Sequence, residues 1–214
     1  TILGTVTTAY PDAGSPGTTT VDGNTLHSLN NSLWATLRDG AGTASGAAQA
    51  SGLIMQISTG TTSGWDGVHR AQYGFDFSAV ADTDTKDSAI LSIFGVSKAN
   101  GNSASLDLNI YSSVLASNTS LAAGDFDGIG TTAFATAITY ANFSTTAYNA
   151  FTLNSDGLSQ ISLTGISNFG ARNANKDAAN VEPTRNGSEL ADSMQGNFAD
   201  ATDTTNDPKL ELTH

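Results

Sequence analysis

The residues that could serve a hydrolase are few and scattered. His27, His69 and His214 are the only imidazoles in the chain, and nucleophilic catalysis needs a base beside its nucleophile. No Gly-x-Ser-x-Gly turn is present. Two of the three glutamates, Glu182 and Glu189, lie in one long polar segment, where solvated loop charges are the simpler interpretation than a glycosidase pair. We therefore expect no catalytic residue and a protein that is not an enzyme.

Aspartates in turns offer a second kind of chemistry. Asp125 and Asp127 flank a phenylalanine and precede Gly128, and Asp82 and Asp84 show the same spacing. Calcium takes hard oxygen ligands from such loops, although the glutamate that closes a complete twelve-residue calcium loop is missing. Solvated turn aspartates are the default interpretation, and a structural calcium at Asp125 and Asp127 is the alternative. No other cofactor is predicted.

Aromatic side chains offer a third possibility, a stacking platform for a sugar ring. Trp34 lies opposite the apolar face of an expected strand over residues 32–38, which places it on the outer surface. With Trp65, Tyr111 and Tyr140 it forms the candidate glycan-binding set. Packing in the core or in a second layer is the favoured interpretation, because most tryptophans are largely buried.

The segment that positions these residues most clearly is residues 70–78. Apolar and polar side chains alternate along it, and the apolar ones are Ala71, Tyr73, Phe75 and Phe77. Period-two alternation is typical of a half-buried β-strand. The polar side chains, Asp76 among them, are then expected on the outer side.

The rest of the chain repeats this pattern at short intervals. About ten strands are expected, and no segment has a helical pattern of ten residues; the strands fall at residues 18–21, 32–38, 53–58, 70–78, 89–96, 106–111, 133–140, 148–153, 166–172 and 209–214. This spacing favours an all-β, jelly-roll-like antiparallel β-sandwich with long loops. We expect an N-terminal arm or leader strand over residues 1–17 and one sandwich domain over residues 18–214.

Particular connections are also predicted. The Asn100-Gly101-Asn102 turn favours a hairpin between residues 89–96 and 106–111. Residues 40–52, 59–67 and 173–207 are expected as loops, and residues 158–161 as a single helical turn. Arg172 and Asp177 are expected to form a surface ion pair, which would contribute little stability.

Composition limits the partners. The 214 residues carry 8 Lys and Arg against 20 Asp and Glu, a net charge of −12, and contain no cysteine. An acidic surface repels nucleic-acid phosphate and anionic lipid, so neither nucleic acid nor a membrane is expected as a partner. No signal peptide and no apolar run of membrane-spanning length are visible. Stability must come from packing rather than from disulfides.

Six short motifs occur in an order that resembles the DNRLRE-type β-sandwich domains. They are Tyr73-Gly74-Phe75-Asp76-Phe77-Ser78, Ser88-Ala89-Ile90-Leu91, Leu108-Asn109-Ile110-Tyr111, Phe151-Thr152-Leu153-Asn154-Ser155-Asp156-Gly157, Phe169-Gly170-Ala171-Arg172 with Asp177, and the closing Pro208-Lys209-Leu210-Glu211-Leu212-Thr213-His214. The resemblance spans residues 32–214, and the motif that names the family is absent. It implies a jelly-roll-like sandwich of the kind found in carbohydrate-binding-like modules and in phage virion proteins.

The functional expectation combines these points. The chain is expected to be a non-enzymatic structural protein of a phage virion, as a capsid decoration or tail component, or of a self-assembling surface filament. Its partners would be copies of itself or other virion or filament proteins. Ile2, Leu3 and Val6 would add a strand to a neighbour's sheet edge. The alternative is a carbohydrate-binding module or adhesin that recognises a surface glycan. Both functions place it in a virion or on an extracellular surface.

Overall fold

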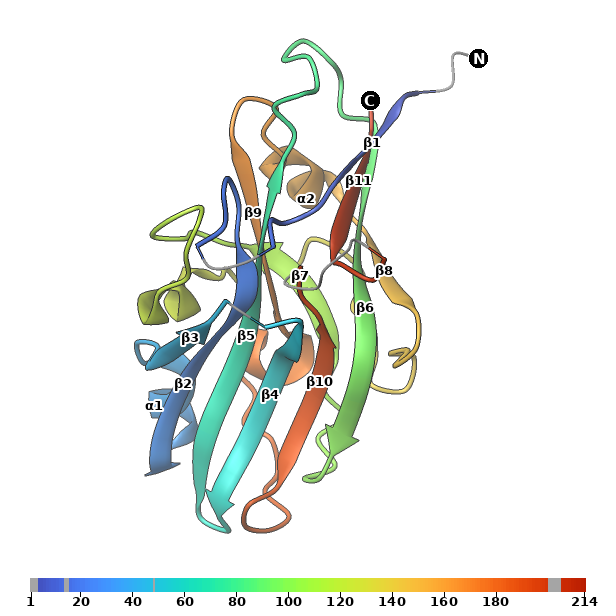
Figure 1. The fold of residues 1–214 in the computed structure, drawn as a ribbon. Coiled ribbons are helices and arrows are strands. Elements are labelled where there is room, and N and C mark those ends of the chain that lie inside the picture. Colours follow the sequence, from blue (N-terminus) through green and yellow to red (C-terminus); the bar gives the residue numbers. More distant parts are fainter. Residues whose placement is uncertain (1–3, 14–15, 48, 200–204) are drawn as a thin grey trace.

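Antiparallel strands make up most of the fold in the computed structural model, which describes residues 4–13, 16–47, 49–199 and 205–214 (Figure 1). The described strands are β1 (Val6–Ala9), β2 (Asp22–Ser32), β3 (Ala44–Gly46), β4 (Ser51–Thr61), β5 (Gly64–Asp76), β6 (Ser88–Asn100), β7 (Leu108–Ser112), β8 (Tyr148–Thr152), β9 (Ile166–Asn173), β10 (Ala191–Asn197) and β11 (Lys209–Thr213). The helical turns are α1 (Trp34–Asp39), η1 (Ala123–Gly128), α2 (Ser155–Gln160) and η2 (Ala174–Ala178). The predicted all-β, sandwich-like class is confirmed.

The sheet divides at the middle of β5. One edge of β5 pairs with β2 over most of its length. The opposite edge pairs first with β4, ending at Met55 with Arg70, and then with β9, beginning at Ala171 with Ala71. From this point β4 continues into β10 and β6, whereas β9 continues into β7. The two branches are the two layers of the sandwich.

A second branch lies on β6. Its first half pairs with both β11 and β8, and its second half pairs with β10. β1 then pairs with β11, which brings the beginning and the end of the described chain together (Figure 1). Because β6 pairs with these strands and β7 pairs with β9, the hairpin predicted between residues 89–96 and 106–111 is wrong.

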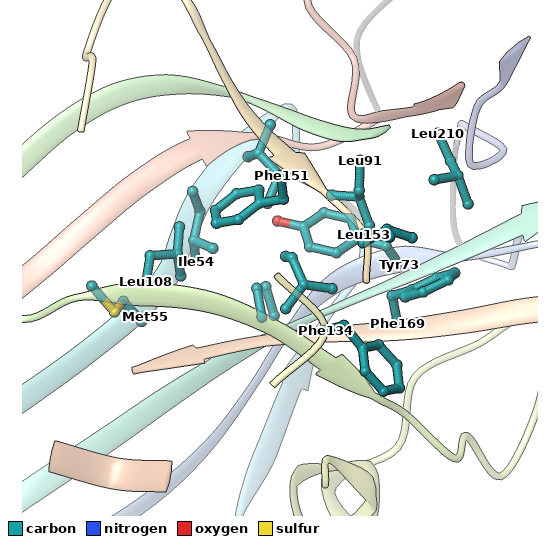
Figure 2. Packing of buried hydrophobic residues seen from close by; sticks show 14 of the residues in the cluster. Ile54, Met55, Tyr73, Leu91, Leu108, Phe134, Phe151, Leu153, Phe169 and Leu210 are labelled. Atoms are coloured by element: carbon teal, nitrogen blue, oxygen red, sulfur yellow. The ribbon is translucent and has the colours of Figure 1, made fainter. Parts of the chain in front are cut away.

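The core lies between the layers and is rich in aromatic rings (Figure 2). Tyr73, Phe75 and Phe77 are fully buried, as the alternation in residues 70–78 predicts. The opposite face of β5 is also covered, however: Arg70 is 2% exposed and Gln72 is 0% exposed. The strand is therefore buried on both faces, not half-buried.

Three predicted strands do not form. Residues 18–21 contain no strand, because β2 begins only at Asp22. Residues 32–38 hold the helix α1 instead, because Trp34 and Leu37, three residues apart, point to one side and are both buried. Leu33 is left 75% exposed. Residues 133–140 contain no named strand and only an isolated bridge between Leu108 and Ile138.

All three segments expected as loops contain strands. Residues 40–52 hold β3 and the first residues of β4. Residues 59–67 belong to the long β4–β5 hairpin, which turns between Thr61 and Gly64. Residues 173–207 contain β10, which lies between β4 and β6. There is no room for a side chain at Gly196 of β10: a Cβ there would lie 2.5 Å from Ile54 and 2.8 Å from the Phe94 carbonyl. Gly196 is what permits this close approach of strands, and it also removes the apolar alternation that marks a strand.

A buried ion cluster occupies the branch point of β5. The Arg70 Nε donates to the Asp177 Oδ2 at 2.9 Å, and its Nη2 donates to Oδ1 at 2.8 Å. The Arg172 Nε donates to the same carboxylate at 3.0 Å. Side-chain exposures are 3% for Arg70, 4% for Arg172 and 1% for Asp177. The predicted pairing of Arg172 with Asp177 is confirmed, but the pair is buried rather than at the surface, because η2 and the segment around η1 cover it.

The environment of the cluster shifts the ionisation of its members. Burial lowers the pKa of Arg70, while Asp177 opposes that shift. Burial alone would raise the pKa of Asp177, but Arg70 and Arg172 outweigh it, and the pKa lies below its usual value. Asp177 therefore stabilises the fold above the carboxyl pKa of the unfolded chain. That contribution is lost as the pH falls through the folded-state pKa.

We expect Asp177→Asn to lower the free energy of unfolding by about 3–5 kcal/mol, because it leaves two buried guanidinium groups without their carboxylate. Denaturant unfolding measures the change. Asp39→Asn is the control, since Asp39 pairs with Arg38 at the surface and its side chain is 52% exposed. That control should change stability by no more than about 1 kcal/mol. Equal losses in the two variants would contradict the role of burial.

Candidate functional site

The four aromatic residues of the predicted sugar platform do not form an exposed surface. Trp34 and Trp65 are 5% and 0% exposed and pack edge to face, with ring centroids 5.5 Å apart. Tyr111 is 2% exposed, and burial raises its pKa to about 12. Tyr140 is half-buried, with the Lys98 Nζ 4.9 Å from its ring centroid. Trp34 packs in the core, the interpretation that the sequence favours, because α1 turns it inward.

The long polar segment covers Trp65. The indole Nε1 donates to the Glu182 Oε1 at 2.9 Å, and the Arg185 guanidinium lies 5.3 Å from the ring centroid. Arg185 also pairs with Glu182. These contacts hold residues 182–185 over the ring, so Glu182 acts here as a partner of the indole.

The predicted calcium ligands have other partners. The Asp125 carboxylate accepts the Ala116 N–H through Oδ1 and the Ala122 N–H through Oδ2, both at 2.8 Å. Asp125 is 3% exposed, so these bonds satisfy a buried carboxylate without a cation. Asp127 is exposed and lines a pocket with Asp39 and the three arginines Arg38, Arg70 and Arg172, whose positive charges disfavour a cation there.

In the other acidic pair, Asp82 and Asp84, only Asp84 contacts His214. Asp84 lies 2.9 Å from the His214 Nδ1, and the His214 Nε2 lies 2.9 Å from the Thr7 hydroxyl. Asp82 is exposed and takes no part in this contact. Within the described parts of the chain, His, Asp and Glu do not gather in any group of three that could hold a metal ion.

The Asp84–His214–Thr7 contact has the order of a catalytic Asp-His-hydroxyl triad. Its hydroxyl belongs to a residue paired within the sheet, Thr7 with Leu212. The pocket beside Asp84 is lined by Lys86, Ser155 and Leu158 but not by Thr7 or His214. The geometry thus describes a clasp that fastens β1 and the segment around Asp84 to the end of β11. His27 is likewise structural: its Nδ1 donates to the Leu37 carbonyl at 2.7 Å.

A polar groove on the face of the sheet that carries the His69 side chain is the candidate binding site. It has a volume of about 270 Å³ and lies across β2, β3, β4, β5 and β10. Its polar side chains are Asn24, Ser45, Gln49, His69 and Gln195. All five are uncharged groups that donate and accept hydrogen bonds when the imidazole is neutral. We call this site the amide groove.

The position of His69 in the amide groove follows from strand register. His69 pairs with Leu26 of β2 on one side and with Gln56 of β4 on the other. Burial lowers the pKa of His69 to about 4, so the imidazole is neutral at physiological pH. Its Nδ1 is buried and has no hydrogen-bond partner among the described residues.

Sequence reasoning placed no site in the amide groove. Its residues come from five strands and a turn that are separated by up to 171 positions (Asn24 to Gln195), and β10 was expected to be a loop. The one local signal was His69 itself, a titratable residue beside the most regular strand pattern in the chain. That pattern predicts only that His69 and Ala71 share a face.

Comparisons with known proteins leave the chain without an assigned family. No protein-family model matches it, and no curated protein is similar enough in sequence to be a relative. The resemblance to DNRLRE-type domains, which rests on the six ordered motifs, stays a prediction. Of the helices that the structure describes, none has the length and apolar character to span a membrane.

The stability of the folded chain should depend on pH through His69. Its pKa of about 4 in the folded state lies below the usual 6.5, so the unfolded chain binds a proton more readily between these values. The contribution of His69 to the free energy of unfolding is therefore at its full value above pH 6.5. It should fall by up to about 3 kcal/mol as the pH drops towards 4. Denaturant unfolding of the wild type and His69→Gln across this range isolates the contribution as a difference curve. A flat difference curve would contradict it.

Proposed function

We propose that the chain is a non-enzymatic structural protein that assembles with copies of itself, or with other proteins of a phage virion or surface filament. The observation that supports assembly is the open outer edge of β1. Unpaired strand edges are templates for pairing with another chain. A virion or extracellular surface is the matching location, and the ordered motifs shared with phage virion domains favour it.

Within the described residues, one side of the β1 backbone is not paired with another strand. Thr5 and His214 exchange both of their backbone hydrogen bonds, at 2.8 and 2.9 Å. Hydrogen-bonded pairs alternate along antiparallel strands, so Thr7 also faces β11. The N–H and C=O groups of Val6 and Thr8 therefore point away from the sheet.

The side chains of this edge are suited to pairing. Val6 is 58% exposed and Thr8 is exposed, and both residue types favour strands. Residues 4–10 include no charged residue, proline or bulge, the features by which proteins usually block an edge. Ile2 and Leu3, also predicted to take part in assembly, lie outside the described residues.

The opposite end of the sheet is different. β3 has only three residues, and the segment that precedes η1 lies against it: the Ser45 hydroxyl donates to the Leu121 carbonyl at 3.0 Å. A Cβ on Gly42 would lie 1.9 Å from the Ala123 carbonyl. A short, covered edge does not accept a further strand readily, so β1 is the better candidate for contact with a neighbour.

The structure also refines how the first residues would act. A leader that donates itself to a neighbour's sheet would have to leave its place, whereas Val6–Ala9 already pairs with β11 in the same chain. The clasp of Thr7 to His214 strengthens this pairing. We therefore propose that β1 stays in its own sheet and accepts a strand from a second copy.

Thr8→Pro should abolish assembly and leave the fold intact, because it removes only an N–H that points away from β11. Proline is tolerated in edge strands at such positions. Sedimentation velocity and electron microscopy measure the assembly, and thermal unfolding measures the fold. Thr7→Pro is the matched comparison: it removes an N–H that bonds Leu212 and should lower the melting temperature. A wild-type chain that stays monomeric, or a Thr8→Pro variant that assembles normally, would contradict the proposal.

A further inference from the structure

We propose that the amide groove binds an uncharged, hydroxyl-rich ligand about the size of one sugar ring. This site is separate from β1 and from the four aromatic residues considered above. Three properties of the groove support the proposal: the neutrality of its lining, its unsatisfied hydrogen-bonding capacity, and the glycines that keep it open.

The lining carries no formal charge in a chain of net charge −12. Among the described residues, no Asp, Glu, Lys or Arg side chain borders the groove. A charged ligand would lose its hydration there without gaining a counter-charge. Amide and hydroxyl groups instead match the hydroxyls of a polyol, each of which donates and accepts hydrogen bonds.

Two polar side chains of the amide groove can form further hydrogen bonds. The buried Nδ1 of His69 has no hydrogen-bond partner in the described structure, and a buried polar atom of this kind is costly unless a ligand or water satisfies it. Asn24 is 6% exposed and uses one amide hydrogen, through a long 3.4 Å bond to the Leu53 carbonyl. A ligand hydroxyl between Asn24 and His69 would give both side chains a further hydrogen-bond partner.

The amide groove has only a small apolar area, which matches the face of one sugar ring. Leu26 and Leu53 are both partly buried and contribute the aliphatic surface of the groove. A pyranose ring presents C–H groups on its faces and hydroxyls at its rim, so this mixture of two leucines with amides fits it. The volume of about 270 Å³ lies just below the roughly 300–1,000 Å³ of ordinary ligand sites, which indicates one ring rather than a chain.

Two glycines maintain the open space. A Cβ on Gly46 would lie 2.4 Å from the Gln49 Nε2 and 3.1 Å from the Asn24 Oδ1. A Cβ on Gly52 would lie 2.8 Å from the Gln49 Oε1 and 3.1 Å from the Phe198 ring. Either methyl group would displace the Gln49 amide, so the two glycines set both the width of the groove and the position of one of its polar groups.

The experiment is an NMR titration of the isotope-labelled full chain with single sugars. Neutral glucose, galactose, mannose and fucose are compared with glucuronate and glucosamine, which are of similar size but charged. We expect at least one neutral sugar to bind in the millimolar range and to shift the amide signals of Asn24, His69 and Gln195. The charged sugars should bind more weakly than their neutral counterparts.

Variants distinguish the amide groove from other surfaces. Gly52→Ala and Gln195→Leu should each weaken binding by about tenfold, the loss expected for one or two hydrogen bonds. Asn142→Ala removes an exposed amide in a distant turn and should bind as the wild type does. The spectrum of each unliganded variant shows whether it is folded, and Gln195→Leu provides a result if the methyl group of Gly52→Ala disturbs Phe198.

The outcomes decide the proposal. Shifts confined to the groove and reduced in both variants support it. No shift with any neutral sugar, shifts at other surfaces, or preferred binding of a charged sugar would overturn it. Because β1 lies at the far end of the sheet from β3, failure here leaves the assembly proposal standing, and a monomeric wild type leaves this one standing.

Discussion

The sandwich depends on one carboxylate shared by two buried arginines. Asp177 follows the end of β9, Arg172 lies within β9, and Arg70 is the last residue of β5 that pairs with β4. The cluster therefore joins the two layers at the point where they part. Two positive charges against one negative are expensive to bury. Further N–H groups of the cluster are satisfied by backbone oxygens: Arg70 donates to the Phe126 and Arg38 carbonyls and Arg172 to the Ile129 carbonyl.

These carbonyl contacts explain why the loops over β5 are ordered. Arg70 also stacks on the Phe126 ring at 3.8 Å, and Gln72 donates to the Asp125 carbonyl at 2.8 Å. The polar face of β5 thus organises η1, and the carboxylate of Asp125 closes the same turn through two backbone N–H groups. Covering one face in this way leaves the opposite face of the same strands, beside His69, as the open groove.

The sequence predicted those features that depend on neighbours along the chain. Alternation found β5 and its aromatic face because period two is a local property. The burial of Arg70 could not be found this way, since its partner lies 107 positions away and arginine is usually exposed. β10 was missed for a related reason: it is held between β4 and β6 by backbone pairing and by Gly196, not by an apolar pattern. The prediction of an aromatic platform is wrong because Trp34 and Leu37 have helical spacing, over a segment too short for that pattern to be recognised. The amide groove could not be predicted because it is composed of strands far apart in sequence.

The two ends of the sheet are treated differently, and this asymmetry connects the proposed functions. At one end β3 is short and lies beside a loop fastened by the arginine cluster, so a concave polar surface can persist there without attracting another strand. At the other end β1 is held by Thr7 and His214 yet keeps its outer backbone groups exposed. A subunit that pairs through β1 would keep the amide groove away from the contact and accessible on every copy. Assembly would then multiply a weak site, and repeated weak contacts with a surface rich in sugars give strong attachment when many are made at once.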